Sequence, residues 1–111
     1  MDSTHFDSLA DALLDSLLRQ LDVLEDVDAE LSQGVLTIDF PNLSDNIPYV
    51  VNSHRAAGQI WMAAERTAWH FTPSAEGRWE SDKPPFHELP TVLSTTFSNK
   101  LGRPIQFHLT V

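Results

Sequence analysis

Residues 58–64 read GQIWMAA, and a repeat of two residues divides this stretch between two unlike faces. Ile60 and Met62 fall on one side, whereas Gln59 and Trp61 fall on the other. A strand with one apolar and one mixed face is typical of an antiparallel sheet that is covered on one side only. We therefore expect Trp61 on the open side, where it either packs flat over cross-strand neighbours or binds a partner.

Similar alternating segments surround this stretch and are separated by short turns. They predict further strands at residues 26–31, 35–40, 49–53, 68–72 and 78–81. The side chains expected to face inward are Leu36, Ile38, Phe40, Tyr49, Val51, Trp69, Phe71 and Trp79. Because successive strands are joined by short connections, we expect an antiparallel meander of five or six strands.

Two segments repeat apolar residues every three or four positions, as amphipathic helices do. The first covers residues 4–26, and the second covers residues 87–101 with Pro90 in its first turn and Gly102 as its stop. Their apolar stripes are Phe6, Ala10, Leu13, Leu17, Leu21 and Leu24, and Phe86, Leu89, Val92, Leu93, Phe97 and Leu101. The tail after residue 104 alternates and should lie extended against the core. The sequence predicts one domain over residues 1–111: a two-layer α+β sandwich with both helices on one face of the sheet.

Composition excludes several classes of function. The chain has 111 residues, is 41% hydrophobic and contains no cysteine, so thiolate metal sites and a cluster held by the chain's own cysteines are excluded. No apolar run approaches the length of a membrane span, and no basic leader opens the sequence. We therefore expect a soluble, cytoplasmic protein.

The net charge of −9 is distributed unevenly. Residues 1–31 hold nine of the sixteen carboxylates and a single base, Arg19. Nucleic acid and anionic membranes are poor partners for such a surface, whereas cations and basic protein patches are favourable ones.

The acids of the first helix form a stripe opposite its apolar side. Asp7, Asp11 and Asp15 are spaced four residues apart, and each such like-charge pair costs about 0.2–0.5 kcal/mol. Asp22 and the acids after it fall in the expected last turns, where the helix dipole disfavours negative charge by about 0.3–1 kcal/mol per group. A solvated helix face is the simplest explanation, but uncompensated repulsion also indicates a bound cation or a basic partner.

No enzyme motif is recognisable. The five histidines lack the spacing of metal ligands, and the sequence contains no glycine-rich phosphate loop. His87-Glu88 is followed by Thr91 at the position where a zinc protease motif needs its second histidine. We read the histidines as ordinary polar residues and expect no enzymatic activity.

Several motifs together resemble the frataxin family, in particular its bacterial branch. They are the acidic first helix, DVDAE at 26–30, GVLTI at 34–38, YVVN at 49–52, QIW at 59–61, Trp79 and the second helix. The resemblance covers nearly the whole chain. It implies an α-β sandwich, an acidic ridge that binds iron weakly, and a role in iron–sulfur cluster assembly beside a cysteine desulfurase and its scaffold protein.

The resemblance also implies which residues carry these roles. The metal-binding residues, called the acidic ridge below, are Asp11, Asp15, Asp22, Asp26, Asp28 and Glu30, with Glu25 added because it lies near them. The partner-binding residues are Asn52, Gln59 and Trp61. Exposed carboxylates suit Fe²⁺, Fe³⁺ and other hard divalent cations, and they bind them weakly. Leu18 and Arg19 interrupt the ridge and should lower its metal capacity.

Three functions follow from these observations. The first is an iron-binding regulator or adaptor of cluster assembly, which the resemblance favours. The second is an acidic protein–protein interaction module whose action needs no metal. The third is a ferroxidase or iron-storage protein, for which the usual spacing of paired carboxylates is absent. We expect a monomer that bound metal could assemble into an oligomer.

Repulsion within the ridge generates a stability prediction. Added salt or a divalent cation such as Mn²⁺ should raise the melting temperature at pH 7, because both offset the repulsion between carboxylates in the folded chain. Thermal melts with and without each addition check this. A melting temperature that neither addition moves would show that the ridge is not strained.

Overall fold

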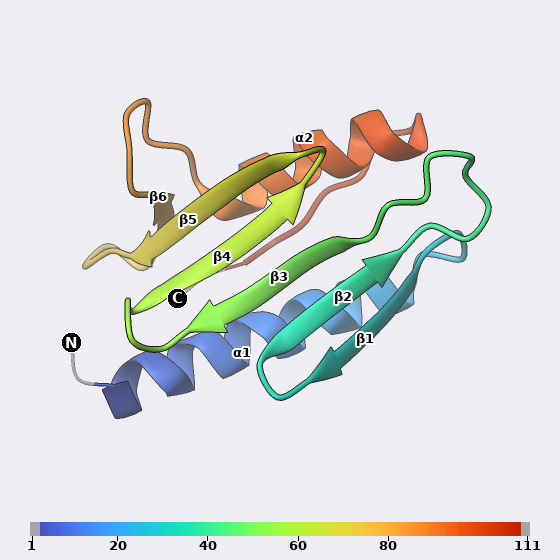
Figure 1. Cartoon of the computed structure of the whole chain (residues 1–111). Coiled ribbons are helices and arrows are strands. Elements are labelled where there is room, and N and C mark those ends of the chain that lie inside the picture. Colours follow the sequence, from blue (N-terminus) through green and yellow to red (C-terminus); the bar gives the residue numbers. More distant parts are fainter. Residues whose placement is uncertain (1–2, 110–111) are drawn as a thin grey trace.

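Each strand of the sheet pairs with the next strand along the chain. The computed structural model describes residues 3–109 and contains one antiparallel sheet in the order β1-β2-β3-β4-β5-β6 (Figure 1). The elements are α1 (Ser3–Asp22), β1 (Asp28–Ser32), β2 (Val35–Asp39), β3 (Tyr49–His54), β4 (Gln59–Ala64), β5 (Thr67–Pro73), β6 (Trp79–Ser81) and α2 (Leu89–Leu101). Both helices lie on one face of the sheet (Figure 1), so the predicted two-layer α+β architecture is confirmed.

Two tight turns set the register of the meander. Gln33 and Gly34 join β1 to β2 with φ of 50° and 78°, and Glu65 and Arg66 join β4 to β5 with φ of 51° and 62°. Positive φ at both central residues is the geometry of the turn that matches the right-handed twist of a hairpin. Glycine is favoured at position 34, because its φ of 78° strains other residues and a Cβ there would lie 2.7 Å from Oγ of Ser53, which would have to move.

The core fills the space between the helices and the inner face of the sheet. The predicted inward residues of β2, β3 and β4 are buried, with Leu36, Val51 and Ile60 fully so. Trp79 is also fully buried, and Phe6 of α1 meets its ring edge-on at 6.2 Å. The Trp79 indole N–H has no hydrogen-bond partner among the described residues, so its large apolar surface is buried despite that cost.

The chain after α2 contacts both helices without joining the sheet. Ile105, Phe107 and Leu109 are buried, as the alternating pattern predicts. Ser98 of α2 accepts the Ile105 N–H at 2.8 Å, and Gln20 of α1 accepts the His108 N–H at 3.0 Å. The extended tail is therefore confirmed through residue 109, while residues 110 and 111 lie outside the described part.

The boundaries of both helices differ from the predicted ones. Helix α1 ends at Asp22 rather than at residue 26, because the chain turns there and Val27 enters the core just before β1. Helix α2 begins at Leu89, after the Pro84-Pro85 segment, and Phe86 is 65% exposed instead of buried. Trp69 and Leu24 are only partly buried. No helix within residues 3–109 combines the length and apolarity needed to cross a membrane.

Candidate functional site

The acidic ridge follows α1 and continues past its end onto the edge strand β1. Asp11, Asp15 and Asp22 are exposed on α1, and Glu25 is exposed in the turn that follows. Asp28 and Glu30 alternate with half-buried residues on β1, as the sequence predicts. Helix α1 packs against β1, so the two elements that carry these carboxylates are neighbours (Figure 1). Because Ala29 and Leu31 pack on the core, the alternating Asp28 and Glu30 face the open side of the sheet.

The ridge does not form a closed set of ligands. Within residues 3–109, no three histidine, aspartate or glutamate side chains converge closely enough to hold one metal ion. Leu18, which interrupts the ridge, is half-buried and packs against the core, while Arg19 is exposed. A cation on this surface would therefore meet dispersed carboxylates and keep most of its water.

Asp26 differs from the other ridge residues because it has a cationic partner. Both terminal guanidinium nitrogens of Arg103, which follows α2, donate to its carboxylate, one of them at 2.9 Å. Hydrogen bonding by Arg103 holds the pKa of Asp26 below its ordinary value of 3.8. The predicted helix-dipole cost at Asp26 and Glu25 is therefore wrong: both lie beyond the end of α1, and Asp26 is neutralised by a residue 77 positions away.

Asp7 also has a partner that is distant in the sequence. Nε of Arg55, in the turn between β3 and β4, lies 3.2 Å from its carboxylate. The expectation that no base offsets the acids of the first helix is wrong at this position. The acids of α1 that have no ion pair within residues 3–109 are therefore Asp11, Asp15 and Asp22.

The open face of the sheet brings together the three predicted partner-binding residues. Asn52 of β3 pairs directly with Trp61 of β4, and Gln59 lies two residues before Trp61 on the same face. Trp61 is half-buried, in contrast to the fully buried Trp79, so its predicted position on the uncovered face is confirmed.

Two imidazole rings cover the indole of Trp61. His54 of β3 stacks on it with ring centroids 3.8 Å apart and planes 14° from parallel. His70 of β5, the cross-strand partner of Trp61, stacks at 4.5 Å and 19°. We call Asn52, His54, Gln59, Trp61 and His70 the aromatic face.

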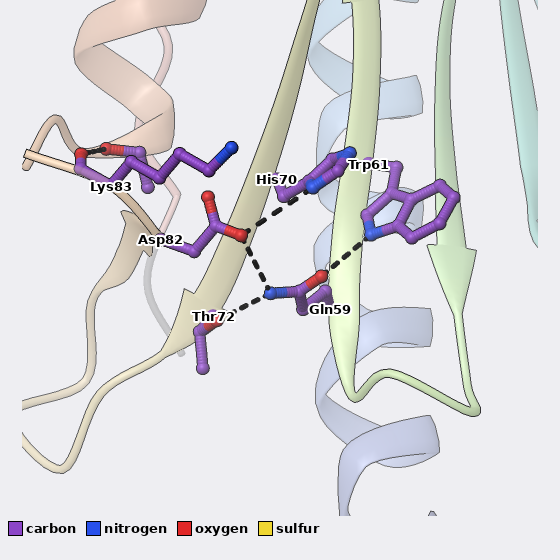
Figure 2. A network of polar contacts seen from close by, with 7 residues as sticks. Gln59, Trp61, His70, Thr72, Asp82 and Lys83 are labelled. Carbon is purple, nitrogen blue, oxygen red and sulfur yellow. Dashed lines mark hydrogen bonds and ion pairs between the residues drawn. The ribbon is translucent and has the colours of Figure 1, made fainter.

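A chain of polar contacts fixes the edge of the same indole (Figure 2). Trp61 Nε1 donates to Gln59 Oε1 at 2.9 Å. Gln59 Nε2 in turn lies 3.3 Å from Thr72 Oγ1 and 3.4 Å from Asp82 Oδ2. The same Asp82 oxygen lies 3.6 Å from Nδ1 of His70. The indole is thus held on both faces and at its nitrogen.

The spacing of His54, His70 and Asp82 along the chain matches no ligand motif, so the sequence pattern does not single these three residues out. The pairing of β4 with its neighbouring strands does indicate that both histidines lie near Trp61. His70 faces Trp61 across the β4–β5 pair, and the outward parity of β3 places His54 beside the same ring.

A second polar cluster holds the loop between β2 and β3. Nζ of Lys100, whose side chain is 7% exposed, lies 3.4 Å from Asp45 and 3.5 Å from Glu65. The hydroxyl of Tyr49 donates to Glu65 at 2.6 Å, and burial together with that carboxylate raises the pKa of Tyr49. Lys100 thus pairs with both carboxylates of this cluster. The cluster anchors the β2–β3 loop and the β4–β5 turn to α2.

Comparison with known proteins places the chain in a family. A family model described as a frataxin-like domain matches residues 1–103. The chain belongs to the frataxin-like family.

Three relatives at 35% identity share the name "Iron-sulfur cluster assembly protein CyaY". The protein of Bordetella petrii aligns over 98% of this chain and 100% of its own length, and that of Dechloromonas aromatica over 95% and 97%. The protein of Aeromonas hydrophila aligns over 74% of each chain. A solved frataxin of the CyaY family from Psychromonas ingrahamii superposes with a TM-score of 0.83 over 97% of this chain and 99% of its own, at 22% identity, which shows the shared fold.

The Arg103–Asp26 pair generates a pH prediction. Arg103→Ala should lower the melting temperature at pH 7, and the difference from wild type should shrink as the pH falls below about 4. A carboxyl with a lowered folded pKa stabilises the fold above its unfolded pKa and loses that contribution as it is protonated. Paired melts at pH 7 and pH 3 measure this. An Arg103→Ala deficit that is equally large at both values would contradict the ion-pair explanation.

Proposed function

We propose that this protein is an iron-binding regulator or adaptor of iron–sulfur cluster assembly. Its membership in the frataxin-like family supports the proposal, as does the shared name of relatives that align over almost the whole chain. The proposed partner is a cysteine desulfurase bound to its scaffold protein, and the proposed location is the cytoplasm. The protein acts as a monomer unless metal assembles it.

The observation that carries the docking proposal is the position of Trp61. It is a large aromatic residue on the sheet face opposite to both helices, beside the polar side chains of Asn52 and Gln59. Such an aromatic residue with a polar rim has the composition of an interface hot spot. A residue needed only for the core would share the parity of Ile60 and Met62.

The iron proposal rests on the acidic ridge. Its exposed carboxylates offer hard oxygen ligands, which suit Fe²⁺ and Fe³⁺, and their dispersion predicts weak, exchangeable binding. Asp26 contributes least, because a metal ion there competes with Arg103. The ridge is therefore proposed as a sensing or delivery surface.

A metal-independent interaction module is the second proposal. The same negative surface would attract a basic patch on the desulfurase without any bound ion. A ferroxidase has less support, because iron oxidation uses clustered carboxylates and residues 3–109 contain no such cluster.

Amide substitutions on the ridge separate the first two proposals. Asp22→Asn, Glu25→Gln and Asp28→Asn together should weaken Fe²⁺ binding at least about tenfold, because three charges near the ion are removed. Anaerobic calorimetry with Fe²⁺ measures the affinity, and a thermal melt should show that the fold is retained. The matched control carries Glu76→Gln, Glu80→Gln and Glu88→Gln, which make the same change in net charge at the opposite edge of the sheet. Equal weakening in both variants would remove the ridge as the specific site.

Replacement of Trp61 tests the docking proposal. Trp61→Ala should destabilise the fold by less than the ~3–5 kcal/mol expected for Trp79→Ala, which removes a fully buried ring. It should nevertheless weaken binding to the purified desulfurase–scaffold complex by ~2 kcal/mol or more, the scale of a hot spot. Denaturant unfolding and biolayer interferometry give the two values. Normal binding with a severe loss of stability would mean that Trp61 is only structural.

A further inference from the structure

The geometry around Trp61 restricts how a partner can contact it. His54 and His70 occupy the two faces of the indole, and Gln59 accepts its N–H. Neither a stacking ring nor a hydrogen-bond acceptor on a partner has a free site on this side chain. The indole can therefore offer a partner only its apolar edge, framed by two imidazoles.

Hydrogen bonds of Asp82 and of its neighbour Ser81 anchor the backbone at Asp82. Asp82 follows β6, and its N–H donates to the carbonyl of His70 at 3.0 Å. Ser81 beside it is buried, and its hydroxyl accepts the His87 N–H at 2.8 Å. These contacts place the Asp82 carboxylate at the edge of β5, pointing toward β4 (Figure 2).

The Asp82 carboxylate and the Trp61 N–H favour the same orientation of the Gln59 amide. A carboxylate accepts hydrogen bonds and does not donate them, so the amide nitrogen of Gln59 faces Asp82 and the amide oxygen faces Trp61. Thr72 cannot make this selection alone, because its hydroxyl can either donate or accept. With the amide reversed, two N–H donors would oppose each other at Trp61.

The Asp82 carboxylate oxygen that contacts Gln59 also lies near the imidazole of His70, which covers one face of the Trp61 indole. Asp82 Oδ2 lies 3.6 Å from His70 Nδ1, and His70 stacks directly on Trp61. A single side chain on a neighbouring strand thus acts on the indole by two routes, through its nitrogen and through one of its faces.

We propose that Asp82 is a positioning residue for Trp61: it orients Gln59 and His70 so that the apolar edge of the indole is presented to the partner. The inference rests on the proposed docking function. It adds that the partner supplies an apolar side chain to this edge, and that docking depends on a residue outside the predicted partner-binding set.

The first test uses the isolated protein and needs no partner. In ¹⁵N–¹H NMR spectra, the Trp61 indole N–H signal is assigned by its absence from Trp61→Phe. Asp82→Ala should shift this signal and speed its exchange with water several-fold, while Asp82→Asn, which keeps an acceptor oxygen, should fall between Asp82→Ala and wild type. Glu76→Ala removes an exposed carboxylate from the neighbouring β5–β6 loop and is the matched control. An unmoved indole signal in Asp82→Ala overturns the proposal, whatever the partner does.

The second test measures affinity for the desulfurase–scaffold complex with the same variants. Asp82→Ala should bind about tenfold more weakly, the loss typical of one hydrogen bond to a charged group, with an unchanged melting temperature and with partial recovery in Asp82→Asn. If Trp61→Ala binds normally, the docking proposal itself fails. If Trp61→Ala binds weakly but Asp82→Ala binds normally despite a shifted indole signal, docking stands and the positioning role is overturned.

Discussion

Burial of one face of the sheet against α1 and α2 dictates where the other side chains of the strands can lie. Leu36, Val51 and Ile60 are fully buried on that face, and the period of two residues then sends their neighbours outward. A register shift of one residue would move Ile60 into water and Trp61 into the core. The exposed position of Trp61 is thus a consequence of core formation. Trp79 of β6 instead points to the inner face of the sheet and is completely buried.

The uneven charge of the chain is moderated by contacts between distant segments. Arg55 reaches Asp7 near the start of α1, and Arg103 reaches Asp26 beyond its end. Both pairs are partly exposed, so each contributes modestly to stability. Their more important effect is local, because they neutralise Asp7 and Asp26 and leave the negative charge of this side of the chain to the remaining acids of the ridge.

The acidic ridge and the aromatic face use different physical principles on different parts of the fold. The ridge lies on α1 and the edge strand β1, where exposed carboxylates act through long-range charge. The aromatic face lies on β3, β4 and β5 at the middle of the sheet, where flat rings and amides give short-range shape. This separation makes the proposed metal and docking roles independently accessible to mutation.

The sequence by itself determined the order of the elements, the two-layer architecture and the side of the sheet on which Trp61 lies. Periodicity carries this information because apolar residues must be buried together, and the spacing that permits it differs between helix and strand. Only the tertiary structure decided that α1 stops at Asp22, that Arg103 neutralises Asp26, and that Asp82 acts on the edge of the Trp61 indole. Those features depend on which side chains meet across strands and turns, and a pattern of residue types along one chain does not specify such meetings.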